Sequence, residues 1–100
     1  MGQKIDVIVP CYKAHAVLPR LLGSIISQVI VEDLKVTLVN DGDEKDYSDI
    51  VKKFSPFVEI QEVKLKKNSG PGTARRFGYE NTSNPLVTWI DADDTFSAAF

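Results

Sequence analysis

Three carboxylates fall within four positions, at Asp91, Asp93 and Asp94, directly after the apolar run 86–90. Like charges held this close raise one another's pKa, and a divalent cation relieves that cost. Carboxylate oxygens are hard ligands that suit Mg²⁺ or Mn²⁺, which proteins bind through one or two carboxylates and the phosphates of a nucleotide. The pattern therefore predicts a metal site, and an acidic turn that caps the next element is the alternative.

A second group of residues is basic and glycine-rich. Its cations lie in a stretch without Asp or Glu: Lys64, Lys66, Lys67, Arg75 and Arg76. Gly70 and Gly72 between them allow the backbone to approach a ligand closely, and a helix that begins there favours anions. The group predicts a phosphate or diphosphate site, with a solvated basic face as the alternative. It is neither a dinucleotide fingerprint nor a P-loop, because the third glycine and the GK[ST] sequence are missing.

A third group is the run Asn-Asp-Gly-Asp at 40–43. Asp41 follows an apolar run and could accept hydrogen bonds from a base or a ribose, although Asx-Gly sequences also form plain turns. Cys11 and His15 follow the first apolar run, and we assign them no chemical role, since a structural cysteine and a surface histidine are the simplest interpretations.

Alternating strands and helices must position these groups. Short β-branched runs predict strands at 5–9, 34–39, 58–63 and 86–90, with the third nearest a sheet edge. Apolar spacing predicts helices at 16–28, 47–54 and 73–81, with Pro19, Pro71 or Thr73 in a first turn or cap. The order β-α-β-α-β-α-β predicts an α/β fold with a mostly parallel sheet. Ligands bind at the carboxyl ends of such strands, where all three groups fall.

Composition narrows the function further. The chain has 100 residues, a formal net charge of −2 and one cysteine. A single cysteine excludes an internal disulfide framework and a multi-cysteine zinc site. The near-neutral charge argues against general nucleic-acid binding, and no apolar run approaches the roughly 20 residues that cross a bilayer. We expect one domain with carboxylate and metal chemistry.

Taken in order, four segments resemble the N-terminal half of family 2, GT-A-type glycosyltransferases. They are VIVPCY at 7–12, VNDG at 39–42, GPGTAR at 70–75 and WIDADD at 89–94. Each is a weak signal alone, but four in the right order cover nearly the whole chain. The resemblance implies a Rossmann-like, mostly parallel sheet with helices on both faces.

The resemblance also implies an activity, the transfer of a sugar from a nucleotide-diphosphate donor, with UDP favoured, to a saccharide, lipid or protein acceptor. By this resemblance Pro10 and Tyr12 line the nucleotide pocket and Asp41 contacts the base. The remaining implied site residues are Gly70, Gly72 and Arg75 near the base or diphosphate, Asp91 near the ribose, and Asp93 on Mn²⁺ or Mg²⁺.

The chain departs from the family pattern at three positions. Lys13 stands where the family commonly has Asn, Asp43 where it has Ser, and Arg76 where it has Asn. These departures bear on which nucleotide is bound. Family members continue into an acceptor site, so we expect the general base beyond Phe100. Residues 1–100 would then form a single donor-binding domain of a longer enzyme, catalytically incomplete by itself.

Two other functions stay open. One is a non-catalytic nucleotide-binding or assembly module of the same fold. The other is a haloacid dehalogenase-like phosphohydrolase, in which Asp91 would be the nucleophile and Asp93 the acid/base of a DxDxT motif that ends at Thr95. We expect a cytoplasmic protein that does not bind nucleic acid. Peripheral association of the full-length protein with the inner face of the membrane, and self-association through an apolar sheet edge, are left open.

Overall fold

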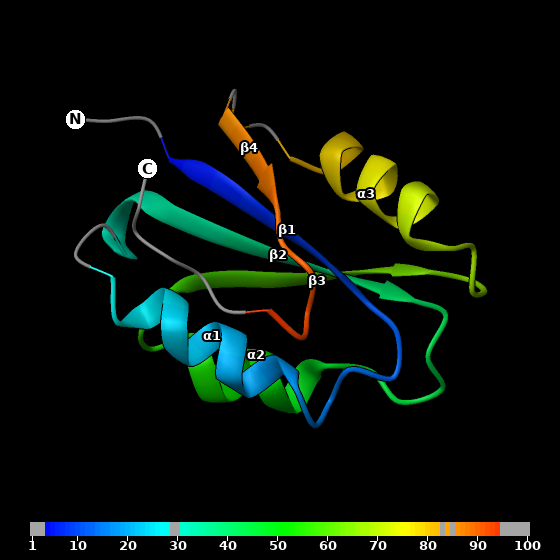
Figure 1. Cartoon of the computed structure of the whole chain (residues 1–100), viewed down its shortest axis with the longest axis horizontal. Coiled ribbons are helices and arrows are strands. Elements are labelled where there is room, and N and C mark those ends of the chain that lie inside the picture. The colour runs from blue at the N-terminus through cyan, green and yellow to red at the C-terminus, as the bar shows by residue number, and fades with distance from the viewer. Residues whose placement is uncertain (1–3, 29–30, 83, 85, 95–100) are drawn as a thin grey trace.

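The computed structural model describes residues 4–28, 31–82, 84 and 86–94. Its elements follow the expected order (Figure 1): β1 (Ile5–Cys11), α1 (Leu18–Ile26), a 3₁₀ turn (Val31–Asp33), β2 (Leu34–Asp41), α2 (Ser48–Phe54), β3 (Glu59–Leu65), α3 (Pro71–Glu80) and β4 (Leu86–Trp89). Within these residues no helix is both long enough and apolar enough to cross a membrane.

The four strands form one parallel sheet in the order β3-β2-β1-β4. The predicted edge position of β3 is confirmed. Chain connections leave β1 toward β2 on one side and reach β4 on the other, so the strand order reverses beside β1. Such a reversal opens a crevice at the carboxyl ends of the strands, where ligands bind in α/β sheets.

Helices cover both faces of the sheet, which confirms the predicted α/β, Rossmann-like class. Figure 1 shows α1 and α2 on one side of the strands and α3 on the other. The larger core lies under α1 and includes Val7, Val9 and Leu21, whereas the smaller core lies under α3. Gly78 lets α3 approach closely, because a Cβ there would lie 2.5 Å from Cγ2 of Ile8.

Several predicted boundaries differ from the structure by one or two residues, among them the end of β2, which continues to Asp41 rather than stopping at residue 39. Three of these differences have a physical reason in the structure. β1 was expected to end before Pro10 but continues to Cys11. The Ile8 carbonyl accepts a hydrogen bond from Ile90, so the nitrogen of Pro10 faces the same side of β1. β4 pairs with β1 only as far as Trp89, so the missing N–H of Pro10 costs no ladder bond.

The helices differ in a similar way. α1 begins at Leu18 rather than near residue 16, because the Ala14 carbonyl accepts the N–H groups of Val17 and Leu18 in a turn. α3 begins at Pro71, two residues earlier than expected, and Gly70 with a φ of 92° precedes it. Pro71 and Thr73, the two residues proposed for a first turn or cap, both lie in the first turn, and Pro71 as the first helical residue has no N–H to lose there.

Candidate functional site

A pocket of about 490 Å³ opens where the loops after β1, β2, β3 and β4 meet. Its walls are formed by Pro10, Cys11, Tyr12, Lys13, Ala14, Val17, Asp41, Asn68, Gly70, Pro71, Asp91, Ala92 and Asp93. The list includes six of the residues predicted from the sequence, at positions 10, 12, 41, 70, 91 and 93. The structure therefore brings together residues that lie up to 83 positions apart in the chain, from Pro10 to Asp93.

Asp41 lies in the pocket wall with a carboxylate that is already engaged by the protein. Its Oδ1 accepts the N–H of Ser69 at 2.7 Å and its Oδ2 accepts the N–H of Gly70 at 3.1 Å. Asp41 is only 3% exposed. The carboxylate therefore fixes the loop that leads into α3, and the lone pairs not used by these bonds are what it can offer a ligand.

At Gly42, unlike the other glycines at this edge of the sheet, the backbone geometry excludes every residue that has a Cβ. Its φ is 82°, and a Cβ would collide with the backbone of Lys67 and Asn68. Gly70 also has a positive φ, but a Cβ there and at Gly72 would meet open space. At Gly42, where the sequence indicated only a turn, the protein's own backbone therefore approaches closely, whereas the close approach of a ligand predicted at Gly70 and Gly72 stays a prediction.

The acidic turn after β4 has the composition and spacing of a cation site. Ligand oxygens of Asp91, Asp93 and Asp94 all lie within 4.8 Å of one another, and all three residues are exposed. The N–H of Asp94 donates to the Asp91 carbonyl at 3.0 Å, which closes the turn. Ala92 between them is buried and anchors the turn against the larger core. Three hard oxygen ligands at this spacing fit Mg²⁺ or Mn²⁺.

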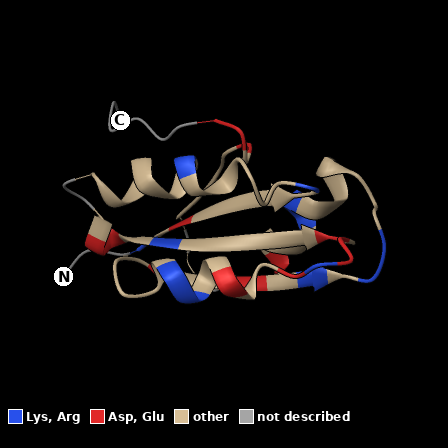
Figure 2. Ribbon diagram, turned by 90° about the horizontal axis from the view of Figure 1, so that it is seen from below, with Lys and Arg blue, Asp and Glu red and all other residues tan. Residues whose placement is uncertain are grey.

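Arg75 connects the basic group to the acidic one. Its Nη2 lies 3.4 Å from Oδ1 of Asp91, and both side chains are substantially exposed. Gly72 and Arg75 do not line the pocket directly, but this ion pair places the guanidinium beside a pocket residue. Figure 2 shows the lysines between β3 and α3 at the end of the molecule toward which the strands point. The small net charge therefore conceals a basic group and an acidic group, which meet at the ion pair of Arg75 with Asp91.

A cluster around Tyr47 also supports the site, and sequence reasoning missed it. The N–H of Lys13 donates to both carboxylate oxygens of Asp43, at 3.0 and 2.9 Å. The Tyr47 hydroxyl donates to Oδ2 of Asp43 and accepts the N–H of Ala14 at 3.1 Å. Tyr47 is fully buried, and its pKa is raised by burial and by the neighbouring Asp43. One signal for it was an aromatic residue in the otherwise polar run 40–49.

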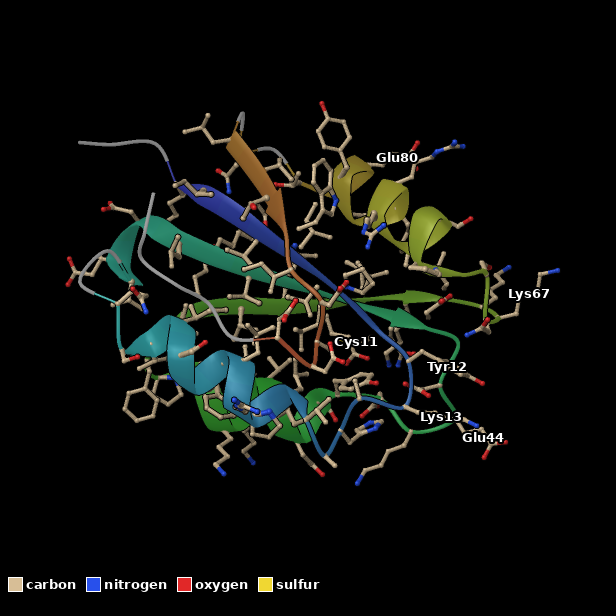
Figure 3. All side chains as sticks on the ribbon, viewed as in Figure 1. Cys11, Tyr12, Lys13, Glu44, Lys67 and Glu80 are labelled. Carbon is tan, nitrogen blue, oxygen red and sulfur yellow. The ribbon has the colours of Figure 1, made fainter. Side chains whose placement is uncertain are left out.

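The two residues left without a role take part in this cluster or border it. His15 stacks on Tyr47 with ring centroids 4.0 Å apart, so the expected surface histidine is half-buried and has a packing partner. Cys11 is fully buried, as a structural cysteine should be, and burial with help from Asp43 and Glu62 raises its pKa. Figure 3 shows Cys11 inside the molecule, with Tyr12 and Lys13 at the end that carries the pocket.

Comparison with known proteins decides the family. The profile described as Glycosyl transferase family 2 matches residues 6–100. The chain belongs to glycosyl transferase family 2. Thr95, which the motif of the phosphohydrolase alternative requires, lies outside the described residues.

Curated relatives agree with this family assignment. Glycosyltransferase GlyA of Streptococcus pneumoniae is 36% identical over 94 residues, which cover 94% of this chain and 13% of GlyA. The uncharacterized glycosyltransferase YwdF of Bacillus subtilis is 32% identical over 94 residues, covering 94% of this chain and 34% of YwdF. The chain thus spans about an eighth of the length of GlyA and about a third of the length of YwdF.

Solved structures share the fold. TarS 1–349 of S. aureus in complex with UDP-GlcNAc superposes with a TM-score of 0.83 and 28% identity, over 93% of this chain and 27% of TarS 1–349. The mannosyltransferase PcManGT of Pyrobaculum calidifontis, in complex with GDP-Man and Mn²⁺, gives a TM-score of 0.82 at 21% identity, over 95% of this chain and 29% of PcManGT. The second likeness concerns the fold alone.

Proposed function

We propose that this domain binds a nucleoside-diphosphate sugar, with UDP as the favoured nucleotide and with a divalent cation, for sugar transfer to an acceptor. One observation carries the proposal: the pocket of about 490 Å³ has Pro10, Tyr12 and Asp41 in its wall together with Asp91 and Asp93. A hydrophobic and aromatic surface beside hydrogen-bond acceptors suits a base and ribose, and exposed carboxylates suit a metal-bound diphosphate.

In this proposal the uridine lies against Pro10 and Tyr12, whose side chain is 47% exposed and free to contact a base. Asp41 faces the base and Asp91 the ribose. The diphosphate lies toward Arg75 and the N-terminus of α3, a ten-residue helix whose first N–H groups favour anions. The complexes of TarS with UDP and UDP-GlcNAc, at 28% identity, support the choice of uridine.

The cation is assigned to Asp93, with Asp91 and Asp94 close enough to share it. When bound, Mn²⁺ or Mg²⁺ supplies Lewis-acid assistance to the departing diphosphate. The protein's own part is to hold the carboxylates near one another and to keep Arg75 beside them. We assign acceptor binding and the general base to parts of the enzyme outside residues 1–100.

The test is a calorimetric titration of the protein with UDP, GDP and ADP, each with and without Mn²⁺. We expect UDP to bind most tightly, and only with Mn²⁺ at full strength. Asp93→Asn should weaken metal-dependent binding about tenfold or more, because a carboxylate ligand is lost. Glu80→Gln is the matched control, since it removes a carboxylate at the far end of α3 (Figure 3).

Three results would contradict the proposal. Nucleotide binding that ignores Mn²⁺ would separate the acidic turn from the nucleotide pocket. Equal effects of Asp93→Asn and Glu80→Gln would show that the carboxylate at 93 has no special role. Absence of UDP, GDP and ADP binding would exclude donor binding by this domain and leave the assembly module as the remaining function.

A further inference from the structure

We propose that Asp43 and Tyr47 are positioning residues that hold residues 12–14, here called the Tyr12 loop, in the shape that lines the nucleotide pocket. This inference rests on the proposed function. Neither Asp43 nor Tyr47 lines that pocket, so both act through the Tyr12 loop. Tyr12 and Lys13 present exposed side chains to the pocket, and any shift of their backbone moves the pocket wall.

The first contact is a backbone-to-carboxylate bond across 30 positions of sequence. Lys13 has a φ of 51°, which is a left-handed conformation. Residues other than Gly, Asn and Asp rarely adopt it. Its N–H points to both oxygens of Asp43, at 3.0 and 2.9 Å. A charge-assisted acceptor at this amide offsets the cost of the strained conformation. Asp43 therefore selects the conformation of the loop.

The second contact comes from the Tyr47 hydroxyl. It accepts the N–H of Ala14 at 3.1 Å and donates its own proton to Asp43. Ala14 and Tyr47 are buried, so water does not compete for these groups. Loss of the hydroxyl would leave a buried N–H without this acceptor, which is one of the costly ways to disturb a fold.

Tyr47 is itself held by residues of other elements. Its N–H donates to the Glu62 carboxylate on β3, with both oxygens at 3.1 Å. His15 stacks on its ring with an interplanar angle of 2°, and Nε2 of His15 reaches the carbonyls of Lys45 and Asp46 at 3.1 and 3.0 Å. The phenol thus has a fixed position relative to the sheet, and it transfers that position to the Tyr12 loop.

The consequence for binding is preorganisation. A loop already in its bound shape loses less conformational freedom when the nucleotide arrives, and affinity rises accordingly. Asp43 and Tyr47, here called the clamp, bind backbone atoms of the Tyr12 loop. The ring of Tyr12 and the amine of Lys13 therefore remain available to a ligand, with the amine 5.4 Å from the ring centroid. The acidic turn, by contrast, receives no bond from Asp43 or Tyr47 among the described residues.

The experiment compares wild type with Tyr47→Phe and Asp43→Asn. Amide hydrogen exchange measured by NMR reports the Tyr12 loop in the free protein, and calorimetry reports UDP binding with Mn²⁺. We expect exchange at Lys13 and Ala14 to accelerate about tenfold or more relative to the strand amides of β1 and β2. The dissociation constant for UDP should rise by about the same factor.

Asp46→Asn is the matched control. It removes the same charge from the same connection, but its side chain contacts Ser48 and Lys64 rather than the Tyr12 loop. We expect it to change neither readout more than about twofold. Affinity for Mn²⁺ alone should be the same in all four proteins, because the cation is assigned to the acidic turn.

The outcomes separate this inference from the proposed function. Unchanged exchange at Lys13 and Ala14 in both variants would overturn the positioning role, whether or not UDP binds. Faster exchange with an unaltered UDP affinity would overturn the link between the clamp and the pocket. If wild type binds no nucleotide, the proposed function fails and so does this link, while the exchange data still decide whether Asp43 and Tyr47 fix the loop.

Discussion

Two groups of carboxylates at the same edge of the sheet differ in their hydrogen bonding and in their exposure to solvent. At the carboxyl end of β2, Asp41 and Asp43 accept hydrogen bonds from backbone N–H groups of the neighbouring loops. After β4, the acidic turn at 91–94 is exposed, and within the described part of the chain Arg75 is the one cation that pairs with it. The first group fixes the loops around the pocket, whereas the second leaves its carboxylate oxygens exposed to a ligand.

The two groups differ in what stabilises their negative charge. Carboxylates that accept two or more N–H bonds are stabilised as anions inside the fold, so their removal leaves donors without partners. Carboxylates crowded together in water repel one another, so their removal relieves strain unless a cation is present. We therefore expect substitutions around β2 to lower the free energy of unfolding strongly and substitutions around β4 to change it little. Ligand binding should instead respond strongly to substitutions in the acidic turn.

The largest stability effect is expected for Gly42→Ala, between the two engaged carboxylates. Its φ of 82° disfavours any side chain, and the new methyl group would collide with the backbone of Lys67 and Asn68. Since backbone cannot move aside as a flexible side chain can, we expect a loss of about 3 kcal/mol or more in the free energy of unfolding. Urea denaturation followed by circular dichroism measures it.

Gly72→Ala is the control for that substitution. A Cβ at Gly72 meets open space within the first turn of α3, and alanine is the better helix former. We expect no loss and a gain of up to about 1 kcal/mol. A similar loss in both variants would contradict the special geometry at Gly42.

A second large effect concerns alkaline pH. Burial, with Asp43 and Glu62 nearby, raises the pKa of the Cys11 thiol above its ordinary value of 9.0. Because the folded state disfavours the thiolate, stability is complete below pH 9 and falls as the pH rises further. The slope approaches about 1.4 kcal/mol per pH unit for one group. The pKa of Tyr47 is also raised, from 10.0, so the decline should steepen above pH 10.

Urea titrations between pH 7 and 10.5 check this sign, with Cys11→Ala as the comparison. The variant should be less stable at neutral pH, since it leaves a small cavity, but its stability should decline less between pH 9 and 10. Parallel curves for the two proteins would show that Cys11 does not cause the decline.

The contrast between the two carboxylate groups was only partly visible in the sequence. Strand and helix order follow from local periodicity, and the acidic turn follows from three residues in four positions. The partners of Asp41 and Asp43 depend on which loops the strand register brings together. Register pairs Cys11 with Asn40, so Lys13 and Asp43 meet although they lie 30 positions apart in the sequence. No local pattern encodes that meeting.

The same limit explains the boundary errors. Pro10 was expected to end β1 because proline lacks an N–H, which is a correct local rule. What decided otherwise was the length of β4, whose pairing with β1 stops at Trp89. Gly42 was interpreted as a turn residue, and only the path of residues 67–68 shows why no other residue fits.

A smaller effect of opposite sign is expected at Lys13. Asparagine tolerates a left-handed backbone better than lysine does, and the N–H that Asp43 accepts is kept in Lys13→Asn. We expect the free energy of unfolding to rise by about 0.5–1 kcal/mol. Lys45→Asn on the neighbouring loop is the control, expected within about 0.5 kcal/mol of wild type. Destabilisation by Lys13→Asn would indicate that the Lys13 side chain, rather than backbone strain, dominates this position.

The smallest stability effect is expected for Arg75→Gln, which removes the cation that pairs with the exposed acidic turn. Arg75 and Asp91 form an ion pair with 43% and 61% of their side chains exposed, so its loss should cost less than about 1 kcal/mol and vanish at high salt. Ligand binding should respond more clearly and in two directions. Removing a positive charge beside the carboxylates should tighten binding of Mn²⁺ alone about two- to fivefold.

Binding of UDP with Mn²⁺ should instead weaken in Arg75→Gln, because the proposed site places this guanidinium near the diphosphate. Calorimetry with Mn²⁺ alone and with the UDP–Mn²⁺ pair measures both changes on the same protein. Opposite signs would show that Arg75 competes with the cation in the free protein and supports the diphosphate in the complex. A change of the same sign in both titrations would mean that Arg75 only shapes the acidic turn through its pair with Asp91.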